Sequence, residues 1–204
     1  EAVSAWRGQE WTDSPETLRM WDIRPINDIP VPPDVRTPRM LQLAELYAGA
    51  LDWPSARQQA VAARIVMGTM QLIIAELPGL PEAIRAQCRA VRTLPEAYAA
   101  ADAADAAARA AGAADAADAA ARAAGAAYAA DAADAAGEAR AAADAARVAA
   151  YAAAYAADAA DETVPGRGVF DIACDIWEQA AEAHLPPRWM GWGRKGDPQL
   201  ETQA

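Results

Sequence analysis

The sequence has very little of the chemistry on which most enzyme sites depend. It contains one histidine, His184, and two cysteines, Cys88 and Cys174, which stand far apart and form no C-x-x-C pair. A histidine-based general base therefore has a single candidate, and a zinc site or a disulfide framework has no sequence support. We expect both thiols to be reduced and buried, and we predict no catalytic residue, no metal ligand and no cofactor.

Two other kinds of segment are missing. No glycine-rich phosphate loop of the common spacings occurs, so nucleotide binding has no support. Even Val61–Leu77 carries Arg64, Gln71 and Glu76, whereas a membrane span needs roughly 18–20 uncharged residues in a row. We therefore expect no membrane span and favour a cytoplasmic location. The chain begins at Glu1 without a methionine, which leaves open the removal of an upstream segment.

Lysine is almost absent, and positive charge is scarce. Of the 18 basic residues 17 are arginine and one is Lys195, and the 29 acidic residues bring the net charge to −11. Neutralising nucleic-acid phosphates requires a basic footprint, so we do not expect direct nucleic-acid binding. The excess of Ala, Arg, Pro and Asp follows from GC-rich codons. Genome drift and repeat expansion therefore explain the alanine as well as selection for a special surface does.

The composition divides the chain into four segments. They are a Trp/Pro-rich N-terminal arm (1–37), a conventional helical core (38–94), an alanine-rich helical repeat region (95–161), and an amphipathic helix with a Trp/Arg tail (162–204). Large apolar side chains concentrate in residues 40–94 and 164–192. An alanine methyl buries little area, so we expect the conventional core to come from these two stretches.

Cap and proline signals delimit the helices that precede the alanine-rich region. Ser14-Pro15 and Thr37-Pro38 each place a capping residue before a proline at the first helical position. The remainder of the first 37 residues is predicted to be an extended arm. Thr93 and Glu96 have capping-box spacing for a further helix. The helices predicted from these signals cover residues 15–21, 38–51, 54–77 and 81–92.

From residue 97 to residue 160 about two thirds of the chain is alanine, with polar residues at steps of three and four. A block of two aspartates, an arginine and a glycine repeats every 13 residues and ends at Gly112, Gly125 and, in degenerate form, Gly137. Alanine has the highest helix propensity, so the region is predicted to be helical. One unbroken helix would span roughly 95 Å. We favour two or more antiparallel helices over one rod, with the break expected at Gly137-Glu138.

A final amphipathic helix is predicted from Phe170 to about His184. Its apolar face consists of Phe170, Ile172, Ala173, Ile176, Trp177 and Ala180. Four carboxylates, those of Asp171, Asp175, Glu178 and Glu182, lie on one side of this helix. A di-metal carboxylate bundle needs Glu-x-x-His pairs, which are missing here, so we interpret these acids as a solvated face.

Three groups of side chains are candidates for contacts with other surfaces. Arg85, Arg89 and Arg92 form a basic stripe, whereas residues 97–162 hold eleven acids and four arginines. We expect the stripe to dock on those acids, within the chain or between copies; an external anionic ligand and plain solvation are the alternatives. Tyrosines in the alanine-rich region either interdigitate between helices or pack against the core. Tryptophans either cover the core, which we favour, or mark a partner surface.

The tract Ala149 to Asp161 resembles uncharacterised alanine-rich Ala/Asp/Tyr-repeat proteins of GC-rich bacteria and their phages. The resemblance covers residues 95–161, is compositional, and implies no activity. The whole sequence predicts an all-α helical bundle with long alanine-rich helices and irregular Trp/Pro-rich arms at both ends.

The function that we predict is non-enzymatic association with a protein partner or with further copies of the chain. The alternatives are an acidic DNA mimic or immunity-type inhibitor that occupies a basic cleft, and an enzyme of unknown type. Two sets of residues are the predicted partner contacts: the terminal tryptophans and the charged stripes of the helices, namely Trp6, Trp11, Trp189, Trp192, Arg85, Arg89, Arg92, Asp102, Asp105, Asp115 and Asp118.

Overall fold

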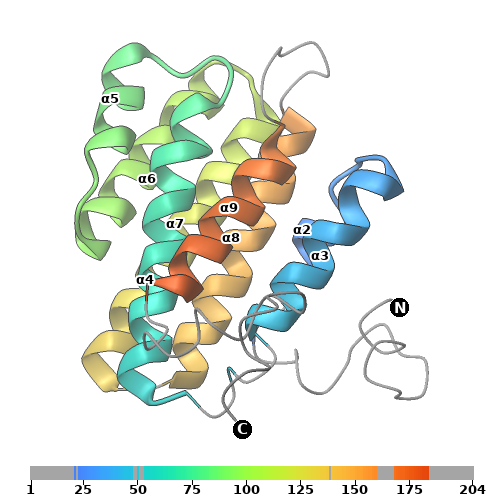
Figure 1. Cartoon of the computed structure of the whole chain (residues 1–204). Coiled ribbons are helices and arrows are strands. Elements are labelled where there is room, and N and C mark those ends of the chain that lie inside the picture. Colours follow the sequence, from blue (N-terminus) through green and yellow to red (C-terminus); the bar gives the residue numbers. More distant parts are fainter. Residues whose placement is uncertain are drawn as a thin grey trace, which may run out of the picture.

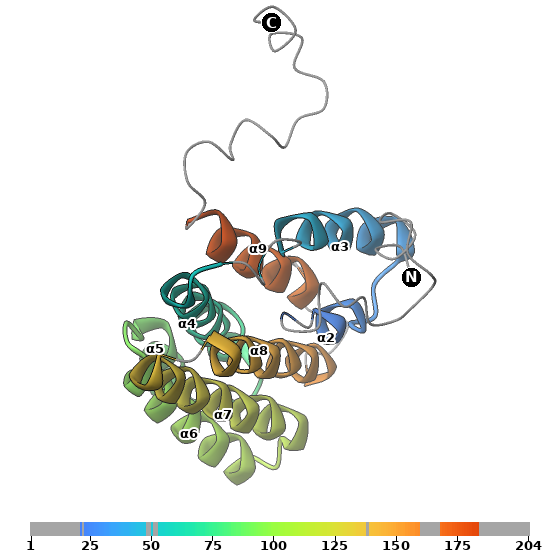
Figure 2. The same cartoon turned by 90° about the horizontal axis from the view of Figure 1, so that it is seen from below.

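The computed structural model describes Trp21, Ala50 and residues 23–47, 53–137, 139–159 and 168–183. Within these residues every regular element is a helix, which confirms the all-α prediction. Figures 1 and 2 show a bundle in which α4 (Ser55–Leu72) and α8 (Ala139–Ala159) lie side by side between α9 (Val169–Glu182) and the other alanine-rich helices, with α3 (Pro33–Tyr47) packed on α9. The predicted helix over residues 15–21 lies outside the described residues, apart from Trp21.

The N-terminal part is more helical than predicted. A single turn, α2 (Arg24–Asn27), is followed by α3 (Pro33–Tyr47), which begins before Thr37 and contains Pro38. The extended arm expected up to residue 37 is therefore wrong for these residues, as is the cap at Thr37. Pro33 presets φ at the first position of α3, and Arg36 Nη2 donates to the Val31 carbonyl at 2.8 Å. These two features start the helix early, although Pro38 removes one hydrogen bond from its interior.

The next helices follow the prediction with one change. Helix α4 (Ser55–Leu72) gives way to a 3₁₀ turn, η3 (Ile74–Glu76), so the predicted helix over 54–77 ends early. Leu77 must adopt an extended conformation because a proline follows it, and its φ and ψ of −56° and 137° show that it does. Helix α5 (Glu82–Ala90) comes next.

Three helices, not one rod, make up the alanine-rich region. These are α6 (Leu94–Ala110), α7 (Ala114–Ala136) and α8 (Ala139–Ala159), antiparallel to their sequence neighbours (Figure 1). The breaks fall at Gly112 and Gly137, whose φ angles of 72° and 70° favour glycine. The break expected at Gly137-Glu138 is confirmed, and Gly112 adds a second. Gly125 stays inside α7.

The first three residues after each glycine explain which glycines break the region. Asp115 follows Gly112 and lies in the first turn of α7, where a carboxylate favours a helix start. Asp115 is the third residue after Gly112, and Glu138 comes directly after Gly137. Tyr128 occupies the corresponding place after Gly125 and supplies no such charge. The capping prediction at Thr93 is also confirmed, because its side chain accepts from the Glu96 N–H.

The predicted conventional core and the alanine-rich region share one continuous interior. Buried alanines of α6, α7 and α8 join the same apolar cluster as the large side chains of α3, α4 and α9. Helix α4 packs on α7 and α8 on one side and on α9 (Val169–Glu182) on the other. The contact with α9 is close at Gly68, where a Cβ would lie 2.8 Å from Ile176 Cγ2. The predicted apolar face of α9 is confirmed for five of its six residues, with Phe170 and Trp177 each about 1% exposed, whereas Ile172 is only half-buried.

Candidate functional site

Nucleophilic chemistry finds no support at the two thiols. Cys88 and Cys174 are free and buried, as predicted. Burial raises the pKa of Cys88 to about 11 and that of Cys174 to about 12, so both remain protonated at neutral pH. Among the residues that the structure describes, no group of three or more His, Cys, Asp or Glu side chains is placed to hold a metal ion.

The acidic side of α9 is not simply a solvated face, which corrects the prediction. Arg39 of α3 donates to Asp175 Oδ1 at 2.6 Å and to Glu178 Oε2 at 3.2 Å. The three side chains are between 12% and 24% exposed. These ion pairs fasten α3 to α9, so Asp175 and Glu178 have a structural role. The sequence carries no signal for the pairing, because Arg39 lies far from both acids along the chain.

Burial and neighbouring charges shift the pKa values of Arg39 and Glu178. Burial lowers the pKa of Arg39, but the hydrogen bond that it donates to Asp175 and the charge of Glu178 outweigh burial, so the pKa of Arg39 is raised. Burial also raises the pKa of Glu178, and Arg39 only partly offsets this because Asp175 and Glu182 repel the charge. Arg39 thus contacts both carboxylates, at 2.6 Å for Asp175 and 2.9 Å for Glu178, while burial disfavours the ionised form of Glu178.

A cluster of aromatic rings packs the C-terminal end of α3 against α4 and α9. The cluster contains five ring pairs with centroids 5.2–6.2 Å apart, formed by Trp21, Tyr47, Trp53 and Trp177. The Tyr47 hydroxyl donates to the Trp177 carbonyl at 3.0 Å, and the Arg57 guanidinium lies 3.8 Å from the centre of the Trp53 ring. The preference for internal packing is thus confirmed for these three tryptophans. Trp6, Trp11, Trp189 and Trp192 lie outside the described residues.

The basic stripe of α5 does not dock on the alanine-rich acids of its own chain. Arg89 pairs with Glu76 and Glu82 at 2.8 and 3.0 Å. Arg85 donates to the carbonyls of Leu77 and Leu80, and Arg92 to those of Arg89 and Val91. Within the described part of the chain, the intramolecular docking that we predicted is therefore absent. The arginines instead find partners close to them in the sequence.

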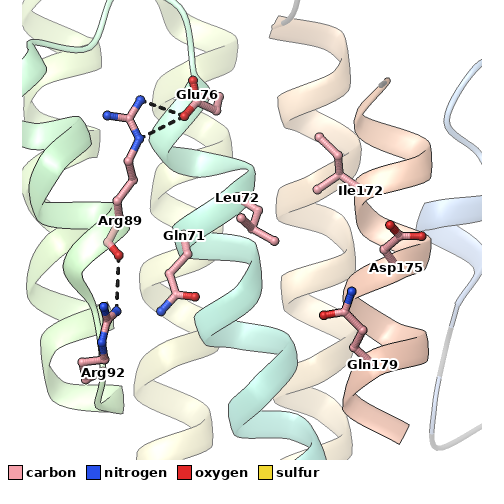
Figure 3. A pocket seen from close by; sticks show the side chains of 8 residues that line it. All are labelled: Gln71, Leu72, Glu76, Arg89, Arg92, Ile172, Asp175 and Gln179. Carbon is pink, nitrogen blue, oxygen red and sulfur yellow. Dashed lines mark hydrogen bonds and ion pairs between the residues drawn. The ribbon is translucent and has the colours of Figure 1, made fainter. Parts of the chain in front are cut away.

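An open groove of about 580 Å³ lies where α5 and α9 flank the end of α4. Figure 3 shows Arg89 and Arg92 along one side, Gln71 and Leu72 on α4, and Ile172 and Gln179 on α9. Leu72 is 49% exposed, which is unusual for a leucine on a packed helix. We call this feature the α4–α5–α9 groove. Leu72 and Ile172 give it an apolar floor, and Arg92 gives it a guanidinium with no carboxylate partner among the described residues. The two acids of its lining, Glu76 and Asp175, are paired with Arg89 and Arg39.

A second exposed apolar feature lies on α6 and α7. Tyr98 and Tyr128 are 45% and 67% exposed, and their ring centroids are 6.1 Å apart. Asp102 and Asp131 each lie one helical turn beyond a tyrosine and are exposed. Neither aspartate has an ion-pair partner among the described residues. We call these four residues the Tyr–Asp face; the helices that carry it, α6 and α7, lie on the opposite side of the bundle from α3 (Figure 2).

The other predicted aspartates surround this face without belonging to one site. Asp105 pairs with Arg109 at 2.7 Å, and Asp115 and Asp118 are exposed near the start of α7. The remaining tyrosines of the region behave differently, since Arg122 lies 4.1 Å from the Tyr155 ring and near that of Tyr151. A sequence signal for the exposed tyrosine does exist. Tyr128 occupies the repeat position that Asp102 and Asp115 fill in the earlier blocks.

Comparisons with known proteins identify no family model, curated protein or solved structure that matches this chain. The likeness to alanine-rich repeat proteins of GC-rich bacteria therefore stays a prediction. None of the helices that the structure describes has both the length and the apolar character needed to cross a bilayer. The function proposed below therefore rests on the surface of the described residues.

Proposed function

We propose that the protein acts by binding another protein chain, without catalysis, and that the Tyr–Asp face of α6 and α7 is its contact surface. The observation that carries this proposal is the pair of exposed tyrosine rings, 6.1 Å apart, that adjoining helices present to solvent. The alanines around them are small, so the rings stand out from the helix surfaces.

The chemistry of this face suits a protein partner. Tyrosine is enriched among residues that dominate binding energy, because its ring covers a large apolar area while few torsions must be fixed. The neighbouring Asp102 and Asp131 carboxylates are exposed and have no ion-pair partner among the described residues, so they can pair across an interface. A partner surface with arginine or lysine beside an apolar recess would satisfy both the rings and the charges.

The proposal can be tested by placing a photo-crosslinking amino acid at Tyr128 and irradiating cells that express the variant. We expect a covalent adduct of defined mass at this position. The matched control carries the same group at Gln42, which is exposed on α3. The adduct at position 128 should disappear when Asp102 and Asp131 are both replaced by lysine. Equal labelling from Gln42, or no adduct at all, would overturn the proposal.

An acidic DNA mimic is a second candidate, and one observation favours it. Asp102, Asp115, Asp118, Asp131 and Asp134 are exposed on two adjoining helices, without ion-pair partners in the part of the chain that the structure describes. Such an inhibitor would bind a basic cleft through charge alone. Its binding would weaken steeply as salt rises and would tolerate loss of the tyrosine rings, whereas binding through the Tyr–Asp face would not tolerate that loss.

A further inference from the structure

We infer that the partner of the Tyr–Asp face is a second copy of this chain, which receives the face in its α4–α5–α9 groove. This inference rests on the proposed function and names the partner. Four large apolar side chains are exposed in the described structure: Val35, Leu72, Tyr98 and Tyr128. Three of the four belong to the face or to the groove.

The groove has the chemistry that the Tyr–Asp face requires. Leu72, with Ile172 beside it, offers an apolar floor to an aromatic ring, and the volume of about 580 Å³ leaves room for side chains to enter. Arg92 forms one edge (Figure 3). Its backbone N–H donates to Glu96 Oε2, whereas its guanidinium donates only to carbonyl oxygens in the described structure. Its positive charge is therefore available to a carboxylate from outside.

The face offers the complementary set. Each tyrosine has an aspartate one turn further along its helix, so a ring that enters the groove brings a carboxylate beside it. When such a ring contacts Leu72, the following carboxylate can pair with Arg92. Charge-assisted hydrogen bonds of this kind add orientation to an apolar contact. Leu72 and Ile172 thus match the aromatic ring, and Arg92 matches the acid.

The two surfaces belong to different faces of the molecule, which decides the kind of assembly. The groove opens between α5 and α9, whereas the Tyr–Asp face lies on α6 and α7 (Figures 2 and 3). One chain cannot bring its own face into its own groove. The contact is therefore head to tail, and each added copy leaves one free face and one free groove. Repetition gives a ring if the rotation closes and a filament if it does not.

Sedimentation and light scattering over a range of concentrations test this inference with three variants. The face variant is Tyr98→Ser with Tyr128→Ser, and the groove variant is Leu72→Glu with Arg92→Glu. The control is Val35→Glu, which alters the exposed apolar residue of α3. Circular dichroism verifies that each variant remains helical. The wild-type mass should rise above 21.3 kDa with concentration, and Val35→Glu should behave as the wild type does.

Mixing supplies the decisive result, because a head-to-tail contact can be rebuilt from two defective chains. The face variant and the groove variant should each weaken self-association about tenfold or more. A one-to-one mixture should form a dimer and stop there, since one intact face meets one intact groove. A wild-type chain that stays monomeric at every concentration, or a mixture that forms no dimer, would overturn the inference.

The crosslinking experiment separates failure of this inference from failure of the proposed function. An adduct at position 128 with twice the chain mass supports a second copy as the partner. An adduct of any other mass overturns the second copy but leaves protein binding at the Tyr–Asp face in place. Salt alone is a poor test, because salt weakens the Arg–Asp pairs and also screens the repulsion between chains of net charge −11.

Discussion

The two halves of the interior bury apolar surface in opposite ways. Around α3, α4 and α9, a few large side chains such as Trp21, Tyr47 and Trp177 fill the space between helices. Around α6, α7 and α8, the buried residues are almost all alanine, and the backbones themselves come close together. A buried tryptophan contributes several kcal/mol and an alanine methyl contributes about 0.8 kcal/mol.

This difference predicts a difference in tolerance to substitution. The aromatic half concentrates its stability in single residues, so the loss of one side chain is severe. The alanine half spreads its stability over many small contacts and over the high helix propensity of alanine itself. A single truncation there should lower the free energy of unfolding only slightly, whereas a change that alters backbone geometry should lower it more.

The largest expected effect is the replacement of Trp177 by alanine. Trp177 is about 1% exposed and contacts both Trp21 and Tyr47, so its loss should lower the free energy of unfolding by about 3–5 kcal/mol. The matched truncation in the alanine half is Ala146→Gly, in a residue that is fully buried. It should cost only about 1–2 kcal/mol, from one methyl and from the low helix propensity of glycine. Urea unfolding followed by circular dichroism measures both, and equal losses would contradict the contrast.

The next effect concerns Gly68, where α4 and α9 are in close contact. In Gly68→Ala the new Cβ would lie 2.8 Å from Ile176 Cγ2, and a β-branched side chain has little freedom to move away. We expect the free energy of unfolding to fall by about 1–3 kcal/mol. Combining it with Ile176→Ala should cost less than the sum of the two single changes. Strict additivity would show that this contact is not the cause.

The glycines of the alanine half give a smaller pair of effects with opposite signs. Gly137→Ala forces alanine to a φ near 70° and should cost about 1–2 kcal/mol. Gly125→Ala, inside α7 with nothing within 4 Å of the new Cβ, should instead add about 0.5–1 kcal/mol. Thermal unfolding of the two variants provides the measurement. A loss of stability in Gly125→Ala would mean that this glycine has a packing role.

The smallest effect is the pH dependence of Glu178. Burial raises its pKa above the ordinary value of 4.5, so the folded protein holds this proton more tightly than the unfolded chain does. The corresponding stability is present below pH 4.5 and is lost as pH rises through the raised value. At pH 7 the free energy of unfolding of Glu178→Gln should therefore equal that of the wild type or exceed it by less than about 1 kcal/mol. In acid the two free energies should converge. Glu45→Gln, an exposed carboxylate of α3, is the control.

Local signals in the sequence were sufficient for much of the fold. The alanine content, the Thr93 cap and the glycine at position 137 predicted the helices α6 to α8 and one of their breaks, because propensity and capping act within a few residues. The spacing of Phe170, Ile176 and Trp177 predicted the buried face of α9 for the same reason. The break at Gly112 was less evident, since Gly125 stands in nearly the same sequence surroundings and remains helical.

Features that depend on a partner distant in the sequence could not be predicted from it. The start of α3 depends on contacts around Arg36, and the role of the acids on α9 depends on Arg39 of another helix. The α5 arginines were expected to meet the alanine-rich acids, but nearer carboxylates and carbonyls hold them. Ion pairing depends on which helices become neighbours, and charge patterns along the chain do not contain that information.

By itself the sequence determined that this protein is helical, that its thiols are protected, and that its second half is built from alanine. Those properties follow from propensity, periodicity and hydrophobicity, which each residue carries with it. Only the tertiary structure decided that Tyr98 and Tyr128 meet on the surface and that Leu72 lies open beside Arg92. The physical reason is that exposure depends on what the rest of the chain leaves uncovered once its helices have packed.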